Sequence, residues 1–127
     1  MERYLIDSNV ISNYFSDVFS EKVTLFLANI IDKVPNVSVM TKIEALSWKN
    51  PNIAKEKMVE LFVDVSNVIS LSDAIVEKCV EIRRTTKTKT PDAIIAATAI
   101  VYGFTLLTSD SDFNRIPDLK YFNPFDL

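Results

Sequence analysis

Four carboxylic acids follow or flank short apolar runs of the sequence, and together they could carry metal chemistry. Asp7 ends the run RYLI, Glu44 lies one helical turn after the run NVSVM, and Asp110 closes the run FTLLTSD. Asp92 lies in the first turn of a helix that we expect to begin after Thr90. Oxygen ligands without histidine or cysteine suit Mg²⁺ or Mn²⁺. The four acids therefore predict a divalent-metal site, for which hydrolysis of phosphodiester bonds is the favoured reaction.

Each of these acids also has a local structural explanation. Asp7 could cap a helix, Asp92 could complement a helix dipole, and the segment TKIE has the spacing of a capping box. Asp110 and Asp112 could shape a turn. Carboxylates aimed at one edge of a sheet repel one another unless a cation lies among them. Capping alone therefore explains the four placements poorly.

The stretch RRTTKTKTPD places four cations just before Asp92, namely Arg83, Arg84, Lys87 and Lys89. The two arginines could complement the dipole of the helix that they end, whereas the lysines lie beyond it. No acid lies among the four, although the chain as a whole has a net charge of −3. We therefore expect this stretch to hold the backbone of a polyanionic substrate.

The lack of histidine and the near lack of glycine exclude several classes of catalytic and binding site. The chain has no histidine, which excludes serine–histidine and cysteine–histidine nucleophiles and the common zinc sites. Its one glycine, Gly103, leaves neither a P-loop nor a G-x-G-x-x-G turn. The net negative charge argues against a passive nucleic-acid-binding surface but is compatible with an acidic site loaded with metal. The single Cys79 lies in an amphipathic pattern and is predicted to be a buried thiol.

Short apolar runs alternate with longer amphipathic stretches along the chain. We expect strands at residues 3–6, 36–40, 68–72 and 104–107, with a possible fifth at 120–125 that Pro124 stops. Helices are expected between them, including one from near Thr41, one over 53–63, and one with Thr90 as N-cap and Gly103 at its end. This alternation predicts an α/β fold with a mostly parallel four- to five-stranded sheet, covered by helices on both faces. All strands then end at one edge, where sites form.

Length and composition favour one domain over residues 1–127, because 48% hydrophobic residues suffice for one core. No apolar run approaches the roughly 18 to 20 residues that cross a bilayer, and MERYLIDSNV lacks the apolar core of a signal peptide. We therefore expect a cytoplasmic protein without a membrane partner. The stretches VTLFLANII and KMVELFVDV carry more large apolar residues than one core stripe needs, which predicts either core packing or a partner interface.

With these residues in place, the chain resembles the PIN-domain family, and within it the small VapC-type toxin ribonucleases, from about Arg3 to the end. YLIDSNVIS is similar to the opening strand and helix of that family, TPDAIIAATAI to its most specific motif, and LLTSDSDF and NPF to its C-terminal block. TKIEAL matches more loosely. The resemblance implies a three-layer α/β/α fold and endoribonuclease activity, usually on structured RNA such as tRNA. It also implies homodimerisation and neutralisation by a cognate antitoxin protein.

Carried over residue by residue, the resemblance implies an acidic quartet around Mg²⁺ or Mn²⁺, made of Asp7, Glu44, Asp92 and Asp110. Asn9 and Thr108 are implied to support the quartet through hydrogen bonds. Asp112 could share the role of Asp110 or replace it. Our hypothesis is that three aspartates hold the metal and that Glu44 orients or activates the attacking water.

Two other classes of protein share parts of this pattern. A phospho-acceptor receiver domain has the same length, a parallel sheet and an acidic Mg²⁺ pocket, and Asp73 could serve as its acceptor. That class needs paired acids at the end of the first strand, where this chain has Asp7 followed by Ser8 and Asn9. A catalytically silent interaction module would keep the fold and use its apolar faces, but the retained quartet argues against it.

Overall fold

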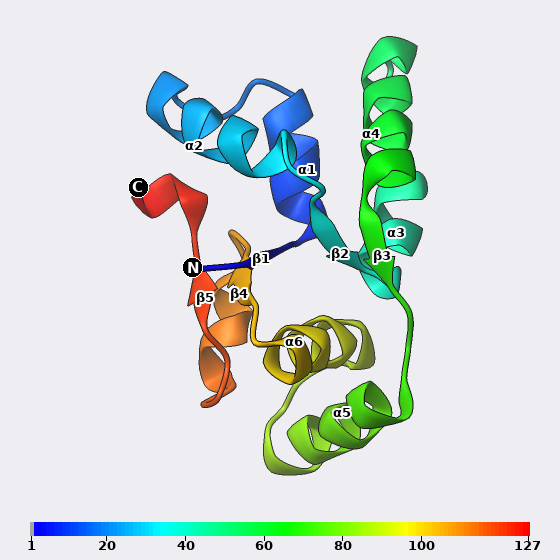
Figure 1. The fold of residues 1–127 in the computed structure, drawn as a ribbon, viewed down its shortest axis with the longest axis vertical. Coiled ribbons are helices and arrows are strands. Elements are labelled where there is room, and N and C mark those ends of the chain that lie inside the picture. Colours follow the sequence, from blue (N-terminus) through cyan, green and yellow to red (C-terminus); the bar gives the residue numbers. More distant parts are fainter. Residues whose placement is uncertain (1) are drawn as a thin grey trace.

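The computed structural model describes residues 2–127, which form a five-stranded sheet with helices on both of its faces (Figure 1). The strands are β1 (Tyr4–Ile6), β2 (Asn36–Ser38), β3 (Asn67–Ile69), β4 (Thr105–Leu107) and β5 (Tyr121–Phe122). Their order in the sheet is β3-β2-β1-β4-β5, and each pair of neighbours is parallel. The predicted α/β fold with a parallel sheet is confirmed. Because the strands are parallel, their carboxyl ends lie along one edge.

The six helices are α1 (Ser8–Phe15), α2 (Glu21–Ile31), α3 (Val39–Leu46), α4 (Ile53–Val65), α5 (Asp73–Thr85) and α6 (Thr90–Tyr102). Two short 3₁₀ helices, η1 (Ser111–Arg115) and η2 (Pro124–Asp126), follow β4 and β5. Figure 1 shows α5 and α6 on one side of the sheet and the first four helices on the other.

The buried side chains form two core clusters, one on each face of the sheet. Leu5 and Leu106 pack with the buried residues of α5 and α6, whereas Ile6 and Leu107 pack with those of α1, α2, α3 and α4. Successive residues of a strand point to opposite faces of the sheet, so two apolar residues in a row supply both cores. Cys79 belongs to the first cluster and is buried, as predicted.

Two helices, α3 and α6, start at residues that differ from the sequence prediction. Ser38 is the N-cap of α3, and its Oγ accepts a hydrogen bond from the backbone N–H of Met40 at 3.1 Å. The helix therefore starts at Val39 rather than near Thr41, the second strand is shorter than predicted, and the TKIE capping box is wrong. In α6 the N-cap is Lys89, without a side-chain cap bond, so Thr90 is the first helical residue.

The other element ends lie close to their predicted positions. The third strand is Asn67–Ile69 rather than 68–72, and the helix predicted over 53–63 continues to Val65. Gly103 ends α6 as predicted, with φ of 70°, a left-handed conformation that glycine adopts without steric cost. None of the helices within residues 2–127 has the length and apolar character needed to cross a bilayer.

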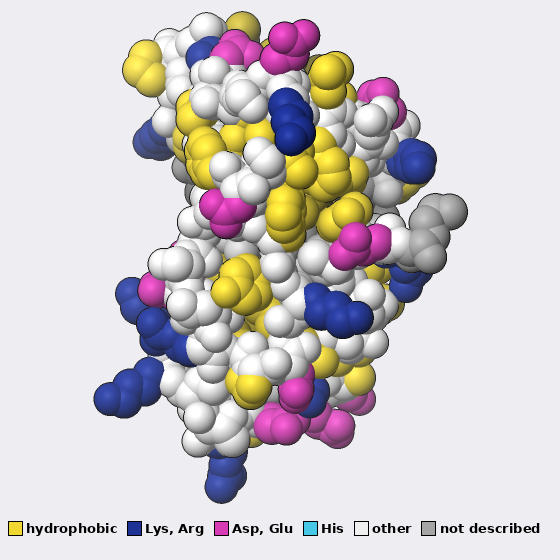
Figure 2. Space-filling model, turned by 90° about the vertical axis from the view of Figure 1, so that its left-hand side faces the viewer, with side chains coloured by type: hydrophobic (Ala, Val, Ile, Leu, Met, Phe, Trp, Pro, Cys, Tyr) yellow, Lys and Arg dark blue, Asp and Glu magenta, His cyan; other side chains and the backbone are white. Residues whose placement is uncertain are grey.

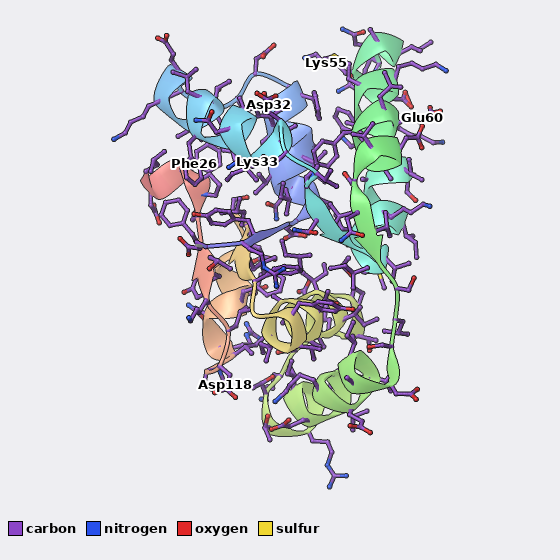
Figure 3. All side chains as sticks on the ribbon, viewed as in Figure 1. Phe26, Asp32, Lys33, Lys55, Glu60 and Asp118 are labelled. Carbon is purple, nitrogen blue, oxygen red and sulfur yellow. The ribbon has the colours of Figure 1, made fainter. Side chains whose placement is uncertain are left out.

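The outer faces of α2 and α4 carry apolar side chains that the core does not cover. Leu25 is 60% exposed, and Met58, Leu61 and Val65 of α4 are exposed as well. Figure 2 shows hydrophobic side chains gathered on the face that includes α2 and the C-terminal segment. In Figure 3, Phe26 reaches from α2 toward that segment, and its ring lies near those of Tyr4 and Phe122. Part of the surplus apolar surface is therefore left free at the surface of the chain.

Candidate functional site

Two neighbouring strands bring Asp7 and Thr108 together. The register of β1 and β4 pairs Ile6 with Leu107, so the next residue of each strand lies at the same edge. The backbone N–H of Asp7 donates to the carbonyl oxygen of Leu107 at 3.0 Å. Asp7 is then the N-cap of α1, where its Oδ1 accepts a hydrogen bond from the N–H of Ser8 at 2.8 Å. One carboxylate thus lies at a strand end, a helix start and a strand-to-strand junction.

The second carboxylate oxygen of Asp7 is held by two side chains. Its Oδ2 accepts hydrogen bonds from Thr108 Oγ1 at 2.8 Å and from Asn9 Nδ2 at 3.0 Å. Asn9 Oδ1 accepts from the N–H of Ser109 at 3.1 Å, and Thr108 Oγ1 accepts from the N–H of Asp110 at 3.1 Å. Asn9 and Thr108 therefore connect the first strand end to the turn that carries Asp110.

Burial is the main influence on the ionisation of Asp7, which is only 4% exposed. It raises the pKa of Asp7 to about 6, against the opposing effect of the hydrogen bonds from Thr108 and Ser8. The charges of Glu44 and Asp92 raise this pKa further. The carboxylate of Asp7 is thus held in an environment that disfavours its negative charge.

Glu44 projects from α3 toward the start of α1. It is half-buried, and its Oε1 accepts a hydrogen bond from Ser8 Oγ at 3.3 Å. Burial raises the pKa of Glu44, the hydrogen bond from Ser8 opposes that effect, and the charge of Asp92 adds to it. Ser8 was not among the site residues expected from the sequence. Its hydroxyl directly after Asp7 was the only signal that could have identified it.

Asp92 lies in the first turn of α6. Burial raises the pKa of its half-buried carboxyl group, and the charges of Asp110 and Asp112 raise it further, whereas Lys89 and Arg115 lower it. Because the charge of Asp92 also raises the pKa values of Asp7 and Glu44, it interacts with every other member of the quartet.

The two acids after β4 have different surroundings. Asp110 is half-buried and caps η1, where its Oδ1 accepts a hydrogen bond from the N–H of Asp112 at 2.9 Å. Asp112 is exposed, and its Oδ1 lies 3.4 Å from Nη2 of Arg115. Both acids therefore line the pocket that contains Asp92, but only Asp112 is exposed and paired with a cation. The turn-shaping role expected of Asp110 and a role in a site are compatible.

Cations line the side of the site that faces the α5–α6 connection. A pocket of about 170 Å³ has Lys87, Lys89 and Arg115 on its walls, together with Asp92, Asp110 and Asp112. Arg115 donates a hydrogen bond to the carbonyl oxygen of Lys87, and so joins the basic loop to the acidic turn. The sequence prediction did not include Arg115, which lies three residues after Asp112.

The two arginines of the basic stretch lie outside this pocket. Arg83 and Arg84 occupy the last turn of α5, where both are exposed. Nε of Arg83 donates to the carbonyl oxygen of Thr88 at 3.3 Å, so it braces the loop that carries the two lysines. The structure thus brings Lys87 and Lys89 to the acids and leaves the two arginines on the helix.

Comparison with known proteins identifies the family. A family model described as a PIN domain matches residues 4–119. The chain belongs to the PIN domain family. PIN domains are nucleases in general, and nucleases of this kind typically use a divalent metal. No curated protein matches the chain in a sequence search.

Solved structures show the same type of PIN domain. A toxin–antitoxin complex from Klebsiella pneumoniae is 26% identical, with a TM-score of 0.76 and coverage of 98% of this chain and 99% of that chain. FitAcB from Neisseria gonorrhoeae is 23% identical, with a TM-score of 0.79 and the same coverage. VapBC2 from Rickettsia felis, bound to a DNA fragment from their promoter, is 19% identical, with a TM-score of 0.78 and coverage of 94% and 97%. The fold is that of a VapC-type PIN domain.

The acids of this PIN domain have the chemistry that a hard divalent cation requires. Their donors are oxygen atoms, and the pKa values of Asp7, Glu44 and Asp92 are all raised, mainly by burial and further by the charges of neighbouring acids. Within residues 2–127, no three acidic side chains are grouped closely enough to hold one ion together in this conformation. The acids thus fit Mg²⁺ or Mn²⁺ by donor type and by charge, but not by their spacing in this conformation.

Thr108→Val is expected to destabilise this PIN domain by about 1–3 kcal/mol, because the valine deprives Asp7, Asn9 and the N–H of Asp110 of a hydrogen-bond partner. The pKa of Asp7 should rise further, since the hydrogen bond from Thr108 lowers it. Chemical denaturation measures the loss, with Thr108→Ser as the matched control that keeps the hydroxyl. Equal stability of the two variants would contradict the role assigned to this hydroxyl.

Proposed function

We propose that this PIN domain is a metal-dependent endoribonuclease that hydrolyses phosphodiester bonds of RNA. The observation that carries the proposal is that acids from separate elements lie close enough at the carboxyl edge of the sheet for their charges to raise one another's pKa values. Asp92 interacts there with Asp7, Glu44 and Asp110, which come from three other parts of the chain. Helix capping explains Asp7 and Asp110, but it explains neither Glu44, well inside α3, nor the raised pKa of Asp92.

In the proposed site Asp7, Asp92 and Asp110 hold Mg²⁺ or Mn²⁺, and Glu44 orients the attacking water. A bound divalent ion supplies a more acidic water and neutralises charge on the phosphate. The Ser8 hydroxyl fixes the direction of Glu44 through its hydrogen bond to Oε1. Asn9 and Thr108 keep Asp7 and the turn of Asp110 in place. We assign the ligand role to Asp110 rather than Asp112 because the exposed Asp112 pairs with Arg115.

The biological setting that we propose is a toxin–antitoxin pair. The similar structures include complexes described as toxin–antitoxin, VapBC and FitAB assemblies. The exposed apolar side chains of α2 and α4 supply surface for a cognate antitoxin and for a second copy of this chain in a homodimer. We further propose that residues 1–127 act as one nuclease domain on cytoplasmic RNA, with tRNA as the first candidate.

The direct test is incubation of the purified protein, free of any partner, with total tRNA and either Mg²⁺ or Mn²⁺. Discrete fragments that disappear with EDTA are the expected result, because the site has no other source of an activated water. Absence of cleavage, together with absence of metal binding by calorimetry, would instead support a silent interaction module.

The receiver-domain alternative has no support in the fold. Asp73 is exposed in the first turn of α5, and its charge does not contribute to the raised pKa values of Asp7, Glu44 or Asp92. Intact mass after incubation with a small phosphodonor is therefore expected to remain unchanged.

The double replacement Lys87→Ala and Lys89→Ala is expected to weaken RNA binding and to reduce the slope of log affinity against log salt by about 1 to 2, because each phosphate contact releases counterions. Fluorescence anisotropy with a labelled oligonucleotide at several salt concentrations measures both effects. The double replacement Lys22→Ala and Lys120→Ala is the matched control, since it removes the same charge and both lysines are exposed and line neither pocket of the site. An equal change in this control would show that the effect is one of net charge alone.

A further inference from the structure

A second pocket lies beside Glu44, and no lysine lines it. Its volume is about 130 Å³. Ser8, Ser12 and Glu44 provide its polar wall, and Ile11, Trp48 and Val59 provide its apolar wall. These residues come from α1, α3 with its following turn, and α4, so three helices build the pocket. Ser8 and Glu44 have a role in the proposed cleavage, but the apolar residues of this pocket do not.

The two pockets have different linings, and both contain an acid whose charge interacts with that of Asp92. Glu44 belongs to the second pocket, whereas Asp110 belongs to the basic one, and the charge of Asp92 acts on both. A strand of RNA that places a phosphate at the acids therefore has two different pockets within reach, one lined by cations and one with Trp48 and no cation in its lining. Cations bind phosphates, but an aromatic wall binds the face of a base.

The polar wall of the second pocket offers acceptors. The hydroxyl hydrogen of Ser8 is donated to Glu44 Oε1, and that of Ser12 is donated to the carbonyl oxygen of Asn9 at 3.2 Å. Both hydroxyl oxygens therefore have lone pairs to offer and no hydrogen left, and the carboxylate of Glu44 is itself an acceptor. Such a wall is matched by a group that donates hydrogen bonds.

The size of the pocket indicates a subsite for part of a longer molecule. Pockets that hold a complete small-molecule ligand usually have volumes of about 300 Å³ or more. Trp48 is half-buried, packs against the core at one edge and belongs to the pocket wall. Its indole can therefore serve as a stacking surface that is fixed in place before a ligand arrives.

We propose that this pocket is a nucleobase subsite, in which the base next to the cleaved phosphate stacks on Trp48 and donates its exocyclic amino group to the hydroxyl oxygen of Ser12 or Ser8. The proposal rests on the proposed ribonuclease function and adds a preference to it. Adenine, cytosine and guanine carry such an amino group, whereas uracil does not. The site thus selects RNA with an unpaired, amino-bearing base at this position.

Trp48 is the one tryptophan of the chain, so its fluorescence reports on this pocket alone. The experiment titrates the complete protein in EDTA, where no cleavage occurs, with single-stranded hexamers of adenosine, cytidine or uridine. A further adenosine hexamer contains an abasic nucleotide. Adenosine and cytidine hexamers are expected to quench Trp48 emission at lower concentrations than uridine, and the abasic nucleotide should reduce the quenching.

Two replacements of Trp48 separate stacking from core packing. Trp48→Leu fills the apolar position without an aromatic ring and is expected to weaken binding of the adenosine hexamer about 5- to 100-fold, measured by anisotropy of a labelled strand. Trp48→Phe retains a ring and should bind more tightly than the leucine variant. Ser12→Ala should reduce the preference for adenosine over uridine, an effect that a purely structural residue would not produce.

The possible failures can be told apart. If the hexamers bind and tRNA is cut, but Trp48 emission does not change or Trp48→Leu binds as tightly as the native protein, the base subsite is overturned and the ribonuclease remains. If neither binding nor cleavage occurs, the proposed function fails, and the subsite fails with it.

Discussion

Asp92→Asn is expected to lower the rate of RNA cleavage at least about 100-fold while the protein stays folded. Ligands of a catalytic metal contribute several kcal/mol of charge stabilisation in the transition state, and each 1.36 kcal/mol is about tenfold in rate. Asp92 has the largest expected effect because its charge interacts with those of Asp7, Glu44 and Asp110. Its carboxylate forms no hydrogen bond or ion pair with residues 2–127, so the isosteric amide leaves no partner unpaired.

Single-turnover cleavage of tRNA with Mn²⁺ measures the loss, and circular dichroism confirms the fold. Asp73→Asn is the matched control, because Asp73 is also in the first turn of a helix. Asp73 is exposed, and its charge does not contribute to the raised pKa of Asp92. The control should cleave at the native rate. Native activity in Asp92→Asn, inhibited by EDTA as before, would remove Asp92 from the site.

The unfolding free energy of the metal-free protein is expected to fall as the pH rises from about 4.5 to 7. Burial raises the pKa of Asp7 from its ordinary value of 3.8 to about 6, so the native state retains a proton that the unfolded chain releases. Stability falls with pH wherever the native state binds more protons. Asp7 alone contributes about 2 kcal/mol over this range, at 1.36 kcal/mol per pH unit. The raised pKa values of Glu44 and Asp92 act in the same direction.

Urea denaturation at a series of pH values in EDTA measures this slope. Mg²⁺ should reverse it, because an ion that binds ionised carboxylates stabilises the native state more at pH 7 than at pH 4.5. Asp7→Asn is the informative variant, since its pH slope should be shallower whatever its absolute stability. A metal-free protein whose stability rises over this range would show that Asp7 is ionised without cost, contrary to its burial.

Helix ends illustrate which details of the fold could be predicted from the sequence. Gly103 was placed correctly because a left-handed residue after an apolar helix is a local property of the chain. The start of α3 was not, because both Ser38 and Thr41 are possible caps in sequence. Both side chains are buried, but Ser38 Oγ accepts the hydrogen bond from the N–H of Met40, whereas Thr41 already lies within the first turn of the helix.

The site likewise has some features that follow from the sequence and others that depend on the tertiary structure. The sequence by itself determined the α/β alternation, the acids at Asp7 and Asp110 after apolar runs, and the absence of histidine chemistry, because each depends on residue types and short spacings. Only the tertiary structure decided the strand order, which makes β1 and β4 neighbours and joins Asp7 to Thr108 across 101 residues. It also decided the burial that raises the pKa of Asp7 and the position of Trp48 beside Glu44. These properties depend on contacts between distant segments, which local periodicity does not encode.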